Sequence, residues 1–338
     1  MAAPLLTDLA CVVHLHTTHS DGTGTVADVV RAARRNALDV VLLTDHDTLA
    51  GKVDEGWHDD VLLLVGEEVS PSRRDHTLVF GVDEVLDHRD RPIADVAREA
   101  PLAFAAHPFS MGSRRFRRFR GMPHSAPFAD SMTGVELWSF VTDTAERAES
   151  VGEVLRFIAR PRAALHGPPP ENLVEWDRAC ARRRVVALGG LDAHQVGKRV
   201  AGRVPLRLMS YARSFRFLRT HVLCGDEPTG DLAQDRDLVY EALGEGRCYI
   251  ANDALAPARG FSFWGDGVLM GEERKAGERT LHVRLPRPAE VRLLRDGEQV
   301  AAATGATLDH EVKRAGSYRV EARLGSRTWI LSNPIYLR

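Results

Sequence analysis

The chain has 338 residues, of which 44% are hydrophobic and 27% charged, and its formal net charge is −2. This length predicts one large domain with a smaller one, and the near-neutral charge argues against a protein that binds nucleic acid or membranes through overall charge. Scattered cysteines, an N-terminus without a basic leader pattern and the lack of any run of ~20 apolar residues predict a cytoplasmic protein without a membrane span.

Short apolar segments alternate with helix-like segments through most of the chain. The first strand is expected at Cys11–Leu15, followed by a helix that Thr25 caps and a last helix at Asp237–Glu245. Further strands are expected at Val40–Leu43, Val61–Val65, Thr77–Phe80, Leu102–Ala106, Val135–Leu137, Val185–Leu188 and Cys248–Ala251. Apolar strands separated by helices predict a βα barrel or an open α/β sheet over residues 1–252.

Two regions depart from this alternation. Residues 109–132 form a long loop-like insert that contains Arg114, Arg115 and Arg117. Residues 253–338 have no helical pattern and consist of short alternating segments between turn residues. These segments are Phe261–Trp264, Leu281–Leu285, Val291–Leu294, Gln299–Ala302, Tyr318–Ala322 and Thr328–Leu331. They predict a small all-β sandwich that follows the α/β domain.

Histidines and carboxylates gather where the expected strands end. His14 and His16 lie two residues apart at the end of the first strand, so their side chains project to the same face and can hold one metal ion. Asp21 follows in the next turn. The other acids and histidines at strand boundaries are His46, Glu68, His76, His107, Asp192 and His194. Because strand ends of a βα barrel meet at one rim, these groups are expected to converge on one centre.

In this order and spacing, the motifs resemble those of the PHP (polymerase and histidinol phosphatase) superfamily over about residues 9–251. The matching motifs are His14-x-His16, Ser20-Asp21-Gly22, Thr44-Asp45-His46, Gly66-x-Glu68, His76, Ala106-His107-Pro108 and Asp192-x-His194. The resemblance implies a distorted (β/α)7 barrel with three divalent ions per chain, variously zinc, manganese or iron. It also implies hydrolysis of a phosphate ester.

The resemblance further assigns ligands to each ion. The first ion is assigned His14, His16, Glu68 and Asp192. Glu68 would bridge to a second ion, which His76 and His107 also hold, and the family's Gly-x-Glu pattern favours Glu68 over its neighbour Glu67. A third ion is assigned the remaining ligands, which are Asp21, His46 and His194.

The C-terminal sandwich and the ending Ser332-Asn333-Pro334-Ile335-Tyr336 resemble the CehA/McbA-type subgroup, which includes ester and carbamate hydrolases. The sequence therefore leaves two hydrolytic functions open: cleavage of a phosphomonoester or small phosphodiester, and cleavage of a carboxylic ester, carbamate or amide. A non-catalytic metal-binding interaction protein is a third alternative. In the first case the partner is a small phosphoester. Nuclease action is supported only by the arginines of residues 114–120 and is not expected, and the sequence does not indicate an oligomeric state.

Several residues keep more than one interpretation. Multi-metal sites lower the pKa of bound water, so no protein nucleophile is needed, and His194 and His19 are candidates for the acid. Arg114, Arg115 and Arg117 are either a solvated face or a lid that binds phosphate. The remaining ambiguous acids and the histidines without ligand spacing were interpreted as turn, supporting or surface residues. They are Asp45, Asp47 and Glu136, and His58, His88, His124, His166, His221 and His310.

Overall fold

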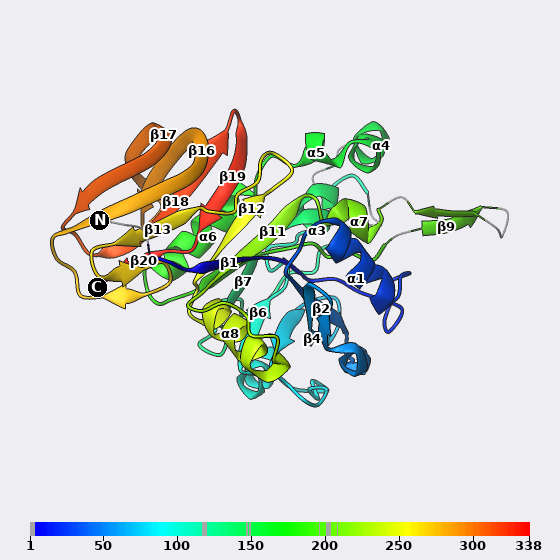
Figure 1. Ribbon diagram of the computed structural model, residues 1–338. Coiled ribbons are helices and arrows are strands. Elements are labelled where there is room, and N and C mark those ends of the chain that lie inside the picture. The colour runs from blue at the N-terminus through cyan, green and yellow to red at the C-terminus, as the bar shows by residue number, and fades with distance from the viewer. Residues whose placement is uncertain are drawn as a thin grey trace.

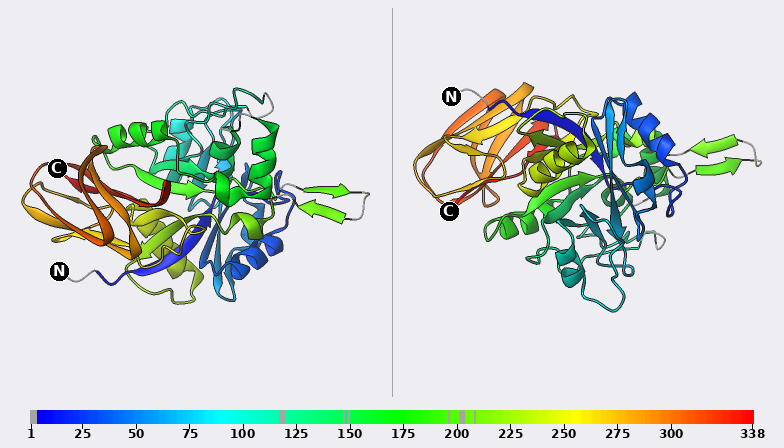
Figure 2. Two further views of the ribbon diagram at one scale, coloured as in Figure 1. Left: turned by 90° about the horizontal axis from the view of Figure 1, so that it is seen from above. Right: turned by 60° about the horizontal axis from the view of Figure 1, so that its bottom comes forward.

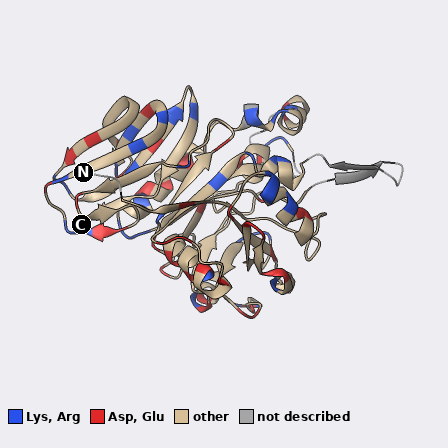
Figure 3. Cartoon of the chain, in the orientation of Figure 1, with Lys and Arg blue, Asp and Glu red and all other residues tan. Residues whose placement is uncertain are grey.

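The structure is a computed structural model of the whole chain. It describes residues 4–116, 120–146, 148, 150–195, 197–200, 204–207 and 209–338. Within these residues, no helix is long and apolar enough to cross a membrane. Lys and Arg residues are interspersed with Asp and Glu residues along both halves of the described chain (Figure 3).

A mixed sheet forms the N-terminal part. Its successive hydrogen-bonded strands are β1 (Thr7–Val13), β2 (Val40–His46), β4 (Val61–Val69), β5 (Thr77–Phe80), β6 (Leu102–Ala105), β7 (Gly134–Ser139) and β8 (Val186–Gly190). All neighbours pair in parallel except at β5, which is antiparallel to β4 and β6. Every residue of β4 is buried, as expected for a strand covered on both faces. The predicted strands in this part are confirmed, most of them with longer or shifted ends. The first strand, however, ends at Val13 and not at Leu15, so His14 lies beyond the strand on which it was expected.

The two ends of this strand series approach each other near the start of the chain. Leu15 and Ala193 form an isolated parallel bridge, and the Leu191 N–H donates to the carbonyl of Val13 at 2.9 Å. The strand ladders themselves do not run continuously from β8 back to β1. The structure therefore establishes a mixed α/β sheet, and closure into a barrel stays a prediction.

Strand β1 also pairs on its other side with β11 (Leu218–Cys224), which continues to β12 (Cys248–Asn252). Strand β11 was not predicted, because its sequence mixes polar and apolar residues. A two-stranded hairpin of β9 (Gly197–Val200) and β10 (Val204–Arg207) extends away from the body of the molecule (Figure 2). A short strand, β3 (Gly56–His58), lies antiparallel to β4.

Helices cover the sheet (Figure 1). Helix α1 (Val26–Arg35) begins where predicted, with a capping box in which the Asp28 N–H donates to the Thr25 side chain at 3.2 Å. The last helix, α8, starts earlier than expected. The remaining helices are α2 (Ile93–Val96), α3 (Phe140–Glu146), α4 (Val151–Ala159), α5 (Pro161–Ala164), α6 (Pro170–Cys180), α7 (Tyr211–Ser214) and α8 (Leu232–Gly244), with 3₁₀ turns at Ala50–Asp54 and Ala97–Glu99.

The C-terminal part is built of strands alone. These are β13 (Ser262–Gly265), β14 (Val268–Leu269), β15 (Glu273–Arg274), β16 (Arg279–Arg295), β17 (Glu298–Val312), β18 (Gly316–Leu324), β19 (Arg327–Ser332) and β20 (Ile335–Leu337). The prediction of two strands at Leu281–Leu285 and Val291–Leu294 is wrong, because both lie in β16. A register shift against β17 between Arg284 and Ala289 bends this long strand. The residues at the bend are exposed, so in the sequence they have the pattern of a turn between two strands.

The two parts share one hydrogen-bonded sheet and a buried contact. Strand β19 pairs with β12, so the C-terminal strands lie against the N-terminal sheet (Figure 1). Arg319 on β18 forms a bidentate ion pair with Asp177 on α6. Its Nε and Nη2 lie 2.7 and 2.8 Å from the two carboxylate oxygens, and both side chains are buried. The Asn333 side chain accepts from the Ala187 N–H and donates to the Cys248 carbonyl, both at 2.8 Å. A domain boundary after residue 252 stays a prediction.

Candidate metal centre

Nine histidines and carboxylates from separate strand ends lie together in the structure. Four groups are formed, and within each group the nitrogen or oxygen donor atoms lie within 4.8 Å of one another. They are His14, His16 and Asp192; His14, Glu68 and His107; His46, Glu68 and His76; and His16, Asp21, His46 and His194. The nine residues are the predicted ligands, so the sheet brings together side chains up to 180 positions apart (14 to 194).

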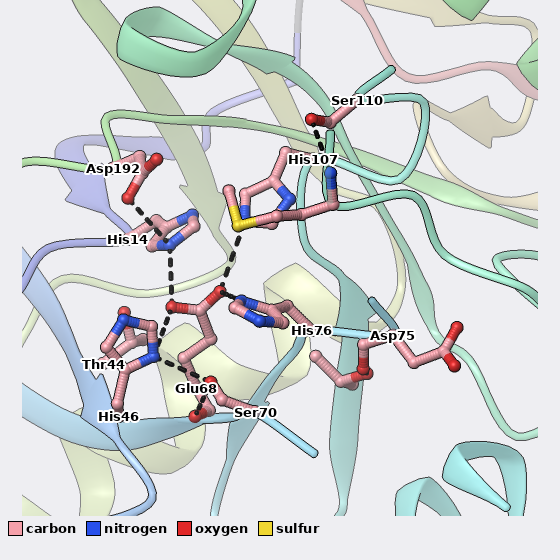
Figure 4. Close-up of polar contacts among 12 residues, drawn as sticks. His14, Thr44, His46, Glu68, Ser70, Asp75, His76, His107, Ser110 and Asp192 are labelled. Carbon is pink, nitrogen blue, oxygen red and sulfur yellow. Dashed lines mark hydrogen bonds and ion pairs between the residues drawn. The ribbon is translucent and has the colours of Figure 1, made fainter. Parts of the chain in front are cut away.

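The backbone turns sharply where these side chains leave their strands. His14, His107 and Asp192 have positive φ angles of 63°, 28° and 50°. Residues other than glycine rarely adopt this region, which costs on the order of 1–3 kcal/mol at each position. The strand ends thus hold unfavourable backbone conformations, and the side chains they carry point into the shared centre (Figure 4).

Glu68 lies in the middle of the cluster, and its two oxygens face different histidines (Figure 4). Oε2 lies 3.3 Å from His14 Nε2, 3.2 Å from His16 Nε2 and 3.1 Å from His46 Nδ1. Oε1 lies 2.8 Å from His76 Nδ1 and 3.3 Å from His107 Nε2. A carboxylate with this arrangement can bridge two cations, each shared with a different pair of imidazoles.

The outer part of the cluster reaches the solvent. His194 Nε2 lies 3.1 Å from Asp21 Oδ1, and His46 Nε2 lies 3.7 Å from the same oxygen. The side chain of Asp21 is 59% exposed, whereas those of His14 and Glu68 are 0% and 1% exposed. The cluster therefore has a buried inner end and an open outer end, from which a substrate can approach.

Three of the histidines have one ring nitrogen held by a group that can only accept a hydrogen bond. The Nδ1–H of His14 faces the Glu136 carboxylate at 3.1 Å, and the Nε2–H of His76 donates to the Ser72 carbonyl at 2.8 Å. The Nδ1–H of His194 donates to the Asp192 carbonyl at 3.1 Å. In each ring the other nitrogen faces the cluster and is the one that can bind a metal once it is deprotonated, as in metal-binding histidines.

The electrostatics of the cluster favour cations. Burial disfavours charge on Glu68, but His14 and hydrogen bonds from neighbouring imidazoles hold the pKa of that carboxyl well below its usual range. Burial likewise opposes ionisation of Asp192, and His14 keeps its pKa well below the usual value. For His14, burial lowers the pKa, but Glu136 and Glu68 outweigh it and raise the pKa well above the ordinary value. The carboxylates are therefore ionised, and positive charge is stabilised between them.

Unpaired nitrogens in the cluster fit a metal ion. Both ring nitrogens of His16 and the Nδ1 of His107 are buried without a hydrogen-bond partner. A buried polar atom left without a partner costs about 1–3 kcal/mol, and a cation bound to such an atom removes that cost. Imidazole and carboxylate donors suit zinc, manganese and iron, so the residues present fit the ions that the sequence motifs imply.

The other predicted site residues lie apart from the cluster. His19 is exposed and belongs to none of the four groups of the described chain. Arg114 and Arg115 are exposed on the insert, and Arg117 lies outside the described residues. No contact of the described residues links either of these two arginines to the nine.

Two histidines interpreted as surface or loop residues are in fact buried. His221 is 0% exposed and lies between Asp8, 2.7 Å from its Nδ1, and Asp253, 3.3 Å from its Nε2. His124 is 6% exposed and hydrogen-bonds to Thr77, and burial lowers its pKa to about 4. Neither stands in a ligand motif, so local sequence gave no sign that tertiary packing buries it.

Sequence reasoning missed several residues that support the cluster. The Thr142 hydroxyl donates to Asp192 Oδ2 at 2.7 Å, and Ser70 Oγ lies 2.7 Å from His46 Nδ1. Ser70 stands two residues after Glu68, a spacing that could have indicated it. Asp45 accepts hydrogen bonds from the backbone and hydroxyl of Thr17 at 2.6 and 2.7 Å, so it holds a loop, as one of the two interpretations predicted.

No protein-family model and no curated protein sequence matches the chain. Among solved structures, a two-domain protein from Bacteroides vulgatus, described as containing a predicted PHP-like metal-dependent phosphoesterase, is similar with 16% identity and a TM-score of 0.45, over 97% of this chain and 95% of that one. A protein from Bifidobacterium adolescentis, described as a candidate metal-dependent phosphoesterase, is similar with 20% identity and a TM-score of 0.33, over 54% of this chain and 87% of that one. Likeness at this level does not decide the chemistry of this chain, which has to come from its own residues.

Proposed function

We propose that this protein is a metal-dependent hydrolase that cleaves a phosphomonoester or small phosphodiester. The observation that supports this most directly is the position of Glu68. Its two oxygens divide between the His14–His16 pair and the His76–His107 pair, at 2.8 to 3.3 Å. The motifs that carry these residues resemble those of the PHP superfamily, whose members with a full set of ligands include phosphoesterases.

The finer assignments follow from the same motifs. We propose three divalent ions, of zinc, manganese or iron, with the ligand division given above, in a barrel of PHP type. Divalent cations at such a centre supply a nucleophile at neutral pH and take up the negative charge that develops on the phosphoryl group. A small phosphoester in the cytoplasm is the proposed substrate.

The residues of the chain then hold the ions and orient the substrate. His194 cannot act as ligand and acid at once, because its Nδ1–H is held by the Asp192 carbonyl and only Nε2 faces the cluster. We assign His194 to the metal. A proton donor for the leaving group then has to come from solvent or from a group near the open end.

The test is an activity panel with matched variants. The metal-loaded protein is expected to hydrolyse at least one phosphomonoester or small phosphodiester, and Glu68→Gln to lose activity by ~100-fold or more, because the bridging charge is removed. Glu55→Gln serves as a control, since Glu55 accepts a backbone N–H from Val65 at 2.8 Å and belongs to none of the four groups of the described residues. A fully metal-loaded protein without turnover on any phosphoester would exclude the proposal.

A second candidate is hydrolysis of carboxylic esters, carbamates or amides, which the chain ending favours. In the structure Asn333 and Tyr336 belong to the packing between the two parts, since the Tyr336 hydroxyl accepts from the Val185 N–H at 3.2 Å. The ending therefore stabilises the fold and takes no part in the cluster. Turnover of aryl esters or carbamates by the same preparation, without phosphatase activity, would favour this candidate.

A further inference from the structure

Glu136 lies behind the cluster and is bound to two of its members. It lies on β7, is 1% exposed, and uses each carboxylate oxygen for a different partner. Oε1 lies 3.1 Å from His14 Nδ1, and Oε2 accepts the backbone N–H of His107 at 2.7 Å. One side chain thus joins the ends of β1 and β6, which lead into His14 and His107.

We propose that Glu136 is a positioning residue: it fixes the tautomer of His14 and the backbone of His107, so that both rings are ready to bind a cation. This inference rests on the metal centre proposed above. Glu136 itself would not contact the metal, because His14 lies between its carboxylate and the other donors.

Hydrogen bonding to Glu136 selects the tautomer of His14. An ionised carboxylate only accepts, so the nitrogen that faces Glu136 carries the hydrogen. The opposite nitrogen, Nε2, is then the one that can bind a cation in place of its proton, and it lies 3.3 Å from Glu68 and 3.6 Å from Asp192. A ligating histidine held by a carboxylate in this way is also a stronger electron donor to the metal.

Glu136 acts on His107 through the backbone of that residue. The residue has a φ of 28°, a strained value, and its ring Nδ1 is buried without a hydrogen-bond partner. The hydrogen bond from its backbone N–H to Glu136 therefore holds the turn that directs Nε2 towards Glu68, 3.3 Å away. Without it, the strain favours a different backbone conformation.

Gly190 at the end of β8 makes room for this carboxylate. A Cβ at this position would lie 1.9 Å from Glu136 Oε1, which no structure tolerates. Any side chain at position 190 would therefore displace the oxygen that faces His14. Gly190 thus provides the space that the Glu136 carboxylate needs to face His14.

Replacement of Glu136 by glutamine keeps the size of the side chain but changes its hydrogen-bonding groups. The amide has one accepting oxygen and one donating nitrogen, so it cannot accept from both His14 and His107. If the oxygen keeps the His107 N–H, the amide nitrogen faces His14 Nδ1 and selects the tautomer whose Nε2 is protonated and cannot bind a metal. In the opposite orientation, the amide nitrogen meets the His107 N–H and that hydrogen bond is lost.

The experiment measures metal affinity directly. Zinc and manganese binding to metal-free protein is followed by equilibrium dialysis with elemental analysis, for wild type, Glu136→Gln and the control Glu55→Gln. At least one class of sites in Glu136→Gln is expected to weaken by ~10–100-fold, as for other supporting carboxylates, while Glu55→Gln matches wild type. In ¹⁵N-histidine NMR spectra of the zinc-loaded protein, the His14 signal, assigned by its loss in His14→Gln, should show Nδ1 protonated in wild type and change in Glu136→Gln.

A second variant decides the matter if Glu136→Gln does not fold. Gly190→Ala keeps the glutamate but forces its carboxylate from His14, so it should weaken the same class of sites. In a Glu136→Ala background, Gly190→Ala should cost little more, because the colliding oxygen is gone. Wild-type protein that takes up no metal would overturn the proposed function. Wild type that binds metal, with Glu136→Gln or Gly190→Ala of equal affinity and unchanged His14 signals, would overturn this inference alone.

Discussion

Buried ionisable side chains define this molecule at the scale of single residues, and not all of them belong to the metal centre. His221 is enclosed by Asp8 and Asp253 and stacks on Tyr249, with ring centroids 4.7 Å apart. Burial lowers its pKa, but hydrogen bonds and charge from the two carboxylates outweigh this and raise it above the ordinary value. The hydroxyl of Tyr249 donates to Asp8 at 2.7 Å, so the group is fully hydrogen-bonded.

This group gives a pH dependence of stability. Because the pKa of His221 is raised on folding, its contribution is complete below the unfolded value of about 6.5 and is lost as the pH rises through the folded value. His221→Gln is therefore expected to lower the free energy of unfolding by about 1–3 kcal/mol at pH 5.5, and by less at alkaline pH. Urea unfolding of metal-free protein across this range measures the difference.

The exposed His166 provides the control, since only its backbone makes a described hydrogen bond, to Thr328. His166→Gln should match wild type at every pH. A stability difference between His221→Gln and wild type that stays constant with pH, or grows towards alkaline pH, would contradict the assignment of the raised pKa.

The ligand residues were predictable because their chemistry is local to a motif. His14 and His16 stand two apart at a strand end, and such spacing survives in the sequence whatever the rest of the fold does. Glu136 and His221 carry no such spacing. Their partners are 122 and 213 residues away in the chain, so only the folded structure shows what they contact.

At the scale of elements, the contact between β18 and α6 fastens the C-terminal strands to the N-terminal part. Arg319 binds Asp177 through two hydrogen bonds, and its guanidinium lies 5.6 Å from the centre of the Trp176 ring. Removal of one of the two charges would be costly. The remaining charge would stay buried, and its desolvation penalty would no longer be offset by the attraction of its partner.

We expect Arg319→Met to lower the free energy of unfolding by about 3–5 kcal/mol, because Asp177 is left buried and unpaired. The double variant Arg319→Met with Asp177→Leu should recover most of this loss, since an apolar pair of similar size avoids the penalty. Equilibrium unfolding of the four proteins in urea forms a double-mutant cycle. Additive effects of the two substitutions would show that the pair is not coupled.

Helices and strands with a clear capping signal or a run of apolar residues were predicted well. Strands whose extent depends on the strands they pair with were not. The helix after Thr25 and the strand at Thr77–Phe80 lie where capping and apolar runs placed them. The long strand β16 was divided in two, because its middle is exposed at a bend. Strand β11 was missed, since its burial comes from β1 and β12 on either side and leaves no run of apolar residues.

At the scale of the whole molecule, the burial gradient through the cluster predicts the order in which ions leave. The group with Asp21 is open to solvent, while Glu68 and His14 are enclosed. During exposure to a chelator, about one third of the bound ions are expected to leave in a fast phase and the rest in a slower one. Elemental analysis of samples taken over time measures this, and metal loss in a single phase would contradict the gradient.

The proposed ions would bind the folded state alone, so their removal should also lower the midpoint of thermal unfolding. The free energy of unfolding is expected to fall by about 2.7 kcal/mol for each removed ion that had been supplied at 100 times its dissociation constant.

In the chelator experiment, Asp21→Asn should abolish the fast phase of metal loss and leave the slow phase unchanged. A substitution that alters both phases equally would mean that the ions are not held in separate positions.

The last segment of the chain has a consequence for how the protein is made in the cell. Asn333 and Tyr336 provide hydrogen-bond partners for β8 and β12, and β8 leads directly into Asp192 and His194. During translation these partners leave the ribosome well after the strands that they complete. Strand β8 therefore gains its hydrogen bonds from Asn333 and Tyr336 late, and loading of the cations is expected to follow the synthesis of these two residues.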